Sequence, residues 1–259
     1  MAGMSGKVLR DYVECREGPW KALVRRDCAD VVAAALIEGR GCEAAFEGGR
    51  GTLLRFAYPD GYGLIRRYLR GGVLRHVLRD AYLFGNRPLR ELLLHSFVYD
   101  AGLAVPKPLG AAWRRAGVVV RGAIATHEVD AVDLATYAER HPTEATEAAG
   151  RCGALIRQMH DLGVWHADLQ VRNILVGTNT EYLIDFDKAR VLGGLDALQR
   201  ARNLFRLRRS IEKNGLSRAL FQAICEGYGA EALPEWTGRI YRAKGAVSDA
   251  LAGRERPRD

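Results

Sequence analysis

This sequence has few lysines, no closely spaced pair of cysteines and no long apolar run. Its five cysteines stand far apart and none belongs to a Cys-x-x-Cys motif, which argues against a zinc site or a disulfide framework and favours a reducing compartment. The longest apolar run, residues 31–37, is far too short to cross a bilayer, and residues 1–13 lack the apolar core of a signal peptide. These absences predict a cytoplasmic protein.

The basic charge of the chain is carried almost entirely by arginine. Lysine and arginine together number 39 against 31 acidic residues, which gives a net charge of +8 and a pI near 9.4. Because the planar guanidinium binds phosphate through two N–H groups at once, this balance favours an anionic partner such as a nucleotide, a phosphorylated lipid, a membrane surface or a nucleic acid. Charge alone does not choose among these partners, and a basic solvated surface would give the same balance.

The 259 residues, 48% of them hydrophobic, suffice for one large or two small folded domains. In the first half, apolar alternation and Gly or Pro punctuation predict a small antiparallel sheet with helices beside it. The expected elements are a helix over 31–38 capped by Asp30 and stopped by Gly39, strands at 52–56 and 62–69, a helix over 88–100 with Pro88 in its first turn, and strand segments at 118–120 and 123–125.

The second half is mainly helical. Apolar residues at steps of three and four predict a helix over 148–162, a short hairpin is expected from 174–176 and 182–184, and the chain from residue 197 onward is expected to be helical. The expected class is α+β and bilobal, with an antiparallel-sheet lobe over 1–127 and a mainly helical lobe over 128–259.

Residues 166–173 read His-Ala-Asp-Leu-Gln-Val-Arg-Asn, and residues 184–187 read Ile-Asp-Phe-Asp. They set a carboxylate (Asp168), a carboxamide (Asn173) and a second carboxylate (Asp185) at the spacing of a kinase-type phosphoryl-transfer site. In such a site Asp168 would orient the attacking hydroxyl and take its proton. Asn173 and Asp185 would supply the hard oxygen ligands that suit Mg²⁺.

Each of these residues also has an ordinary structural interpretation. Asp168 could cap a loop, Asn173 could stabilise a turn, and Asp185 could pair with a nearby arginine. The joint pattern, placed between an amphipathic helix and a hairpin, favours the catalytic interpretation. His166 is the exception, because a histidine at this position more often braces the loop through hydrogen bonds, and a structural role is expected for it.

A kinase-type site also needs a basic residue on a strand beside the nucleotide phosphates, tied to a glutamate of the following helix. No lysine lies on the 62–69 strand, and neighbouring side chains on a strand point to opposite faces, so only one of Arg66 and Arg67 can serve. Arg66 is the expected residue and Glu91 its expected partner. Gly49 and Gly51 could lay backbone N–H groups over the phosphates, although a simple turn explains them about as well.

Three further segments resemble the lipopolysaccharide kinase family. Residues 64–72 are similar to that family's arginine strand and glycine pair, residues 102–108 to the segment after its glutamate helix, and residues 203–213 to its basic helix. The resemblance covers residues 48–213. It implies a protein-kinase-like fold, with ATP and Mg²⁺ as cofactors. The implied acceptor is a hydroxyl, expected to be the 4-hydroxyl, of 3-deoxy-D-manno-octulosonic acid (Kdo) on a lipid A precursor.

By the same resemblance, Asp168 would be the catalytic base, Asn173 and Asp185 the metal ligands, and Arg66 with Glu91 the pair that positions the phosphates. Asp187 stands where the common protein-kinase motif has glycine. This departure argues against a mobile activation loop controlled by phosphorylation and favours a constitutively active small-molecule kinase.

The basic helix is expected to bind the glycolipid head group or an anionic leaflet, which would place the protein peripherally on the cytoplasmic face of the inner membrane. No nucleic-acid partner is expected. The same arginines could instead merely solvate the helix. The residues concerned are Arg206, Arg208 and Arg209, with Arg200, Arg202 and Lys213 beside them.

Two other functions remain open from the residues. One is a kinase of the same fold with another acceptor, such as a core heptose, a protein hydroxyl or an aminoglycoside, because acceptor specificity lies in loops. The other is a catalytically silent module that binds nucleic acid or membrane through its basic surface. The missing strand lysine is the chief support for that second alternative.

Overall fold

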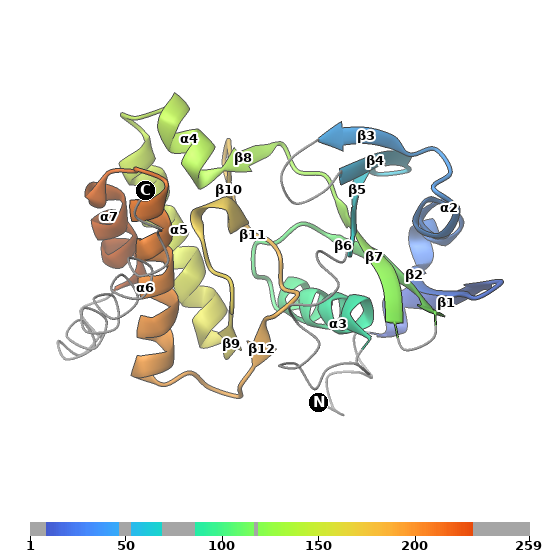
Figure 1. Ribbon diagram of the computed structural model, residues 1–259. Helices are drawn as coiled ribbons and strands as arrows, with labels where there is room; N and C mark the ends of the chain where they lie inside the picture. The colour runs from blue at the N-terminus through green and yellow to red at the C-terminus, as the bar shows by residue number, and fades with distance from the viewer. Residues whose placement is uncertain (1–8, 47–52, 69–85, 117–118, 230–259) are drawn as a thin grey trace, which may run out of the picture. The chain divides into compact units, whose positions relative to one another are not determined.

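The computed structural model describes residues 9–46, 53–68, 86–116 and 119–229. The chain divides into two compact units (Figure 1). The first comprises Met1–Asp130 together with Ile184–Ala189, and the second Ala131–Leu183 with Arg190–Asp259. The sequence placed the short segment Ile184–Ala189 in the second lobe. It belongs to the first unit because its side chains pack against and pair with residues of that unit.

The first unit is built on one antiparallel sheet with the strand order β1-β2-β6-β7-β5-β4-β3. This sheet is larger than the one expected from the sequence, which did not predict β1, β2, β3 or β6. Its strands are β1 (Tyr12–Glu17), β2 (Trp20–Arg25), β3 (Glu43–Phe46), β4 (Leu53–Tyr58), β5 (Gly61–Arg67), β6 (Pro108–Ala116) and β7 (Val119–His127), and a short 3₁₀ turn, η1 (Leu9–Asp11), precedes them.

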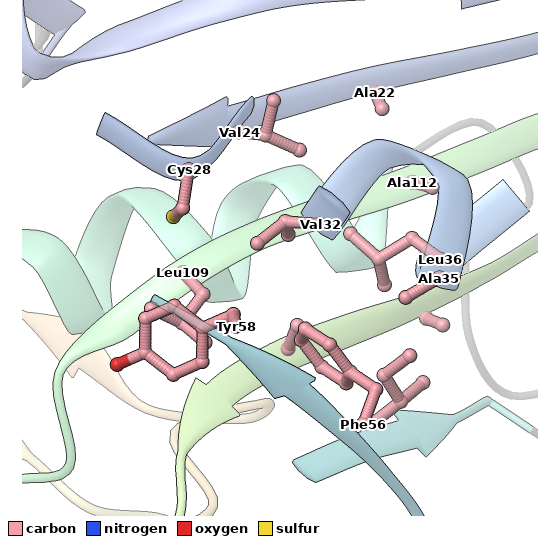
Figure 2. Close-up of a cluster of buried hydrophobic side chains, with 13 residues drawn as sticks. Ala22, Val24, Cys28, Val32, Ala35, Leu36, Phe56, Tyr58, Leu109 and Ala112 are labelled. Atoms are coloured by element: carbon pink, nitrogen blue, oxygen red, sulfur yellow. The ribbon is translucent and has the colours of Figure 1, made fainter. Parts of the chain in front are cut away.

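Helices α2 (Ala29–Glu38) and α3 (Arg87–Asp100) cover opposite faces of this sheet. Strand register explains the division, because alternate residues of a strand point to opposite faces. Ala22, opposite Ala112, belongs to the core beneath α2, whereas Leu23, opposite Ala111, belongs to the core beside α3. Figure 2 shows the first of these cores, with side chains of α2 lying over those of the strands.

Local signals account for the ends of both helices. Asn86 accepts a hydrogen bond from the backbone N–H of Leu89 at 3.3 Å and so caps α3, with Pro88 in the first turn as expected. Helix α2 ends at Gly39, which has the left-handed φ of 75° that glycine adopts without strain. Asp30 was wrongly expected to be the cap of α2. It lies inside the first turn, and the chain enters through η2 (Arg26–Cys28) instead.

The second unit is mainly helical, as expected. The hairpin predicted beside the motif is present, and Ile174 pairs with Leu183 at the end where the motif residues lie. All five cysteines fall within the described residues and are free thiols. The elements are α4 (Leu134–Arg140), α5 (Ala145–Asp161), α6 (Ala197–Lys213) and α7 (Arg218–Tyr228), with β8 (Ala131–Asp133), β9 (Val164–Trp165), η3 (Val171–Asn173), β10 (Ile174–Gly177), β11 (Glu181–Leu183) and β12 (Arg190–Val191).

No helix in the part of the chain that the structure describes has the length and apolar character needed to cross a bilayer.

Helices α5 and α7 approach each other closely through glycine. A Cβ atom added to Gly153 would overlap the carbonyl oxygen of Ile224, and one added to Gly227 would overlap the carbonyl oxygen of Gly150. A Cβ at Gly150 itself would lie 3.8 Å from the nearest atom, the carbonyl oxygen of Ala223, which is ordinary van der Waals contact. Two glycines one turn apart in α5 therefore have different reasons to be glycine.

We expect Gly153→Ala and Gly150→Ala to change stability in opposite directions. The first forces backbone apart and should lower the free energy of unfolding by about 2 kcal/mol or more, the cost of overpacking. The second should be neutral or stabilising by up to about 1 kcal/mol, because alanine is the better helix former. Urea unfolding of both variants measures this, and equal effects would contradict the close approach of α5 and α7.

Candidate functional site

In the first unit, a buried ion pair joins β5 to α3. The Arg66 Nη2 atom donates to both carboxylate oxygens of Glu91 at 2.6 Å, and the side chain of Glu91 is only 3% exposed. The hydroxyl of Tyr68 also donates to this carboxylate. Arg66 lies 3.4 Å from a carboxylate oxygen of Asp185 as well. The pairing expected between Arg66 and Glu91 is therefore present, and it extends to the first carboxylate of the Ile-Asp-Phe-Asp motif.

Strand alternation selects Arg66 over Arg67. Arg67 is exposed and lies on the opposite face of the sheet, beside the end of α2 at Gly39. Burial by itself would lower the pKa of the Arg66 guanidinium, but the negative charges of Glu91 and Asp185 outweigh it and raise that pKa. Arg66 is thus a permanent cation held in one orientation.

The Ile184–Ala189 segment is attached to the rest of the first unit at three successive residues. Asp185 faces Arg66, the ring of Phe186 packs against His95 of α3 with 5.4 Å between ring centroids, and Asp187 forms an ion pair with Arg87. The Arg87 Nε atom donates to Asp187 at 3.0 Å. This segment is consequently held by β5 on one side of the buried Phe186 and by α3 on the other.

Asp185 is the single non-glycine residue with a positive φ, 67°, in the described part of the chain. The left-handed conformation costs a non-glycine residue of order 1 kcal/mol, although aspartate tolerates it better than most. Such strain persists where the surroundings impose it, and it often marks a functional position. Here the contacts of Phe186 and Asp187 hold the backbone in place.

In the second unit, the loop between β9 and β10 carries Asp168 and Asn173. The Asn173 side chain is buried and its Nδ2 atom donates to the backbone oxygen of Asp168 at 2.8 Å. This bond fixes the side-chain amide of Asn173 against the backbone of the loop. The Asp168 carboxylate is half-exposed and accepts a hydrogen bond from the Gln170 side chain at 3.2 Å.

His166 braces this loop, as expected from the sequence. Its Nδ1 atom accepts a hydrogen bond from the Asp168 backbone N–H at 3.2 Å, and the ring is buried. Its own backbone is held by Asn203 of α6, whose amide accepts from the His166 N–H at 3.1 Å and donates to the His166 carbonyl at 3.0 Å. The position of Asp168 therefore depends on a side chain from α6.

The support continues to α5 and α7. Because the Asn203 oxygen can only accept, the His160 Nε2 atom must donate to it, at 3.1 Å, and the His160 Nδ1 atom must accept from the Tyr228 hydroxyl at 2.9 Å. The sequence motifs gave no functional role to His160, Asn203 or Tyr228. Asn203 had a detectable signal, since it is a polar residue on the apolar stripe that Leu207 and Ile211 continue along α6.

Asn173 in the second unit and Asp185 in the first are each, taken by itself, a possible Mg²⁺ ligand. Asn173 and Asp185 offer hard oxygen atoms. Among the described residues, no group of three or more His, Cys, Asp or Glu side chains is gathered as a metal site. A closed zinc-type site is not found there, whereas Mg²⁺ bound through one or two side chains plus phosphate oxygens and water needs no such group.

The predicted basic side chains of α6 fall on two different faces. Arg202, Arg206, Arg209 and Lys213 are exposed at helical spacing, and the Arg206 guanidinium lies 3.7 Å from the Asp168 carboxylate. Arg208 was grouped with them but lies elsewhere: its Nε atom donates to Glu212 at 3.0 Å, and its guanidinium lies over the Phe221 ring of α7.

Arg200 also lies apart from the four exposed basic residues, since it pairs with Asp161 at 2.8 Å. Gly49 and Gly51, predicted to lie over the phosphates, are outside the described residues.

The model of the lipopolysaccharide kinase (Kdo/WaaP) family matches residues 43–228. The chain belongs to this family. A 3-deoxy-D-manno-octulosonic acid kinase of Vibrio vulnificus is 33% identical over 195 residues, covering 71% of this chain and 81% of the relative. One of Haemophilus influenzae is 34% identical, covering 64% and 73%, and one of Xanthomonas euvesicatoria is 38% identical, covering 64% and 68%.

Family membership makes the chain a kinase, as the motif spacing predicted. Among solved structures, a WaaP protein in complex with acyl carrier protein has a TM-score of 0.52 and 20% identity, and the match covers 82% of this chain and 90% of that one. This similarity supports the expected α+β, protein-kinase-like fold. The family region begins at residue 43, so β1, β2 and α2 precede it.

We expect two buried histidines of the family region, His95 and His160, to make the protein acid-sensitive. Burial lowers the pKa of His95 and of His160 to about 4. The unfolded value is about 6.5, so the unfolded chain binds more protons and stability falls as pH drops from about 6.5 toward 4. Each histidine contributes a slope of about 1.4 kcal/mol per pH unit within that window.

Urea unfolding between pH 7.5 and 5 measures the effect. His160→Gln should reduce the slope of stability against pH by about one proton, whereas His141→Gln, a substitution at an exposed histidine, should leave it unchanged. An unaltered slope in His160→Gln would mean that His160 is not held neutral by burial.

Proposed function

We propose that this protein transfers the γ-phosphate of ATP to a hydroxyl, expected to be the 4-hydroxyl, of Kdo on a lipid A precursor. The relatives named as Kdo kinases support the acceptor, and family membership supports the phosphoryl transfer. The observation that carries the proposal in the molecule itself is the Arg66 guanidinium, tied to buried Glu91 and lying 3.4 Å from Asp185. It is a fixed cation next to a carboxylate able to hold a metal.

Asp168 is the proposed catalytic base. A half-exposed carboxylate in a braced loop can accept a hydrogen bond from an incoming sugar hydroxyl, orient its oxygen and take the proton as the new P–O bond forms. The Gln170 side chain donates a hydrogen bond to this carboxylate at 3.2 Å, and the Arg206 guanidinium lies 3.7 Å from it.

Asn173 from the second unit and Asp185 from the first are the proposed ligands of Mg²⁺. When bound, the metal and ATP supply charge neutralisation on the phosphate oxygens and the phosphoryl group itself. Asn173 is suited to this role because its amide nitrogen is engaged by the Asp168 backbone, which orients its oxygen. Asp185 is suited because its backbone is held in one conformation by the contacts that flank it.

Arg66 is the proposed phosphate-positioning residue in place of the lysine of protein kinases. A guanidinium presents several N–H groups in a plane, so it can bind Glu91 through one edge and phosphate oxygens through another. The absence of the strand lysine therefore does not count against catalysis. Glycines Gly49 and Gly51 remain proposed contacts to the phosphates.

We further propose that the exposed stripe of α6 contacts the glycolipid head group or an anionic leaflet, placing the enzyme peripherally on the cytoplasmic face of the inner membrane. Arg206 links this surface to the proposed catalytic base, because its guanidinium lies 3.7 Å from the Asp168 carboxylate. The proximity would bring the phosphorylated acceptor and the catalytic base together. The stripe consists of Arg202, Arg206, Arg209 and Lys213.

We expect Asp168→Asn to lower kcat by about 10²–10⁴-fold while leaving the fold intact, because the general base is lost but a half-exposed loop side chain contributes little to stability. Incubation with Kdo-bearing lipid A precursor, ATP and Mg²⁺, followed by mass measurement of the product, gives the readout. Glu139→Gln, an exposed substitution on α4, serves as the control and should retain wild-type turnover. Near-normal turnover in Asp168→Asn would remove this residue from the mechanism.

We expect Arg206→Glu combined with Arg209→Glu to weaken binding to vesicles containing phosphatidylglycerol by tenfold or more, since each basic residue near an anionic surface contributes about 1 kcal/mol. Vesicle sedimentation at two salt concentrations measures this. The matched control is Arg140→Glu with Arg218→Glu, which makes the same charge change at exposed residues of α4 and α7. Equal loss in both double variants would show a general charge effect and refute a role for the α6 stripe.

A further inference from the structure

The opposite face of the sheet from the Arg66–Glu91 pair carries a second group of arginines. Arg114 of β6 lies directly opposite Arg121 of β7 in the strand register. Arg67 of β5 is opposite Ala123, two residues along the strand from Arg121 and on the same face. The three cations thus occupy neighbouring positions on three adjacent strands, on the face that α2 partly covers.

Like charges placed directly opposite each other on antiparallel strands are destabilising, by a few tenths to about 1 kcal/mol per pair, unless an anion lies near them. Elsewhere in the first unit arginines have acidic partners: Arg25 with Asp27, Arg55 with Glu128, and Arg87 with Asp187, for example. Within the described residues, Arg67, Arg114 and Arg121 lie within ion-pair distance of no carboxylate.

Arg114 is also incompletely satisfied. Its Nε atom is buried and lacks a hydrogen-bond partner among the described residues, and its guanidinium stacks over the Trp20 ring, 5.0 Å from the centroid. Glu17 of β1 lies in line with Arg114 across the strands, but Trp20 of β2 stands between them. Arg121 and Arg67 are exposed. Two of the three arginines are therefore accessible to an anionic partner.

We propose that Arg67, Arg114 and Arg121 form a binding site for phosphate groups, and that its occupant is the phosphate-bearing surface of an anionic lipid layer. A guanidinium can bind phosphate oxygens through two N–H groups, and strand pairing has already placed the three residues on one face of the sheet. It lies on the other face of the sheet from Arg66 and requires no part of the catalytic site. Binding at this face therefore does not depend on which acceptor the catalytic site uses.

The arrangement favours a lipid surface over a single phosphate ion or an RNA strand. The cations lie in a row across strands spaced about 4.8 Å apart, which suits several phosphates in a plane better than one small ion. RNA bases would need an open ring face for stacking, whereas Trp20 packs against the core and lies under Arg114.

The test compares two double variants in vesicle sedimentation. Arg114→Gln with Arg121→Gln should weaken binding to mixed phosphatidylglycerol and phosphatidylcholine vesicles on the order of tenfold or more. The control, Arg16→Gln with Arg115→Gln, removes the same charge from two exposed arginines on the opposite face of this sheet. It should weaken binding much less. Equal losses in the two variants, or no binding of the wild type to these vesicles, would overturn the proposal.

Three further measurements sharpen the test. Arg121→Gln alone should unfold at the wild-type temperature or higher, because it relieves the repulsion with Arg114; a lower temperature would assign Arg121 a purely structural role and overturn the proposal. Millimolar inorganic phosphate at constant ionic strength should not displace the vesicles, and displacement would assign the site to free phosphate. Single-stranded RNA that binds more tightly than vesicles, and loses binding in the same variant, would assign the site to RNA instead.

Discussion

The first unit depends on one buried charge interaction, the bond of Arg66 to Glu91. A carboxylate that is 3% exposed is costly to bury, and only the two guanidinium bonds at 2.6 Å and the Tyr68 hydroxyl make its burial tolerable. Buried ion pairs of this kind seldom add net stability over apolar residues, but losing one partner is expensive. The pair is thus better understood as a device that fixes the orientation of Arg66 and couples β5, α3 and Asp185.

The second unit achieves the same end with neutral groups. His160, Asn203 and His166 form a hydrogen-bonded series from three different elements that ends at the backbone of Asp168. Because the Asn203 oxygen can only accept and its nitrogen can only donate, each hydrogen bond at Asn203 has one allowed direction, and the groups involved are buried. One unit thus relies on charge and the other on directed neutral hydrogen bonds, and each holds a candidate functional side chain, Arg66 or Asp168, in place.

Features encoded locally were predicted from the sequence, and features that depend on packing were not. The α3 and α5 helices and the β10–β11 hairpin carry their own periodicity and punctuation, and alternation along β5 correctly separated Arg66 from Arg67. Strand β6 was missed because it begins with proline and is rich in alanine; its small residues are favoured by helices packed closely on both faces, which no propensity reveals. Arg208 was wrongly grouped with Arg206 and Arg209, because adjacent residues on a helix do not share a face. The role of Asn203 was not predicted, because its hydrogen-bond partners lie far away in the sequence.

The attachment of Ile184–Ala189 at Asp185, Phe186 and Asp187 has a consequence for regulation. Many protein kinases are inactivated when the equivalent stretch moves out of the site and activated when it returns, and a glycine at its third position allows the backbone to make this movement. Here that position is an aspartate clamped by Arg87. The contacts on both sides of Phe186 therefore argue against control by an outward movement of this stretch.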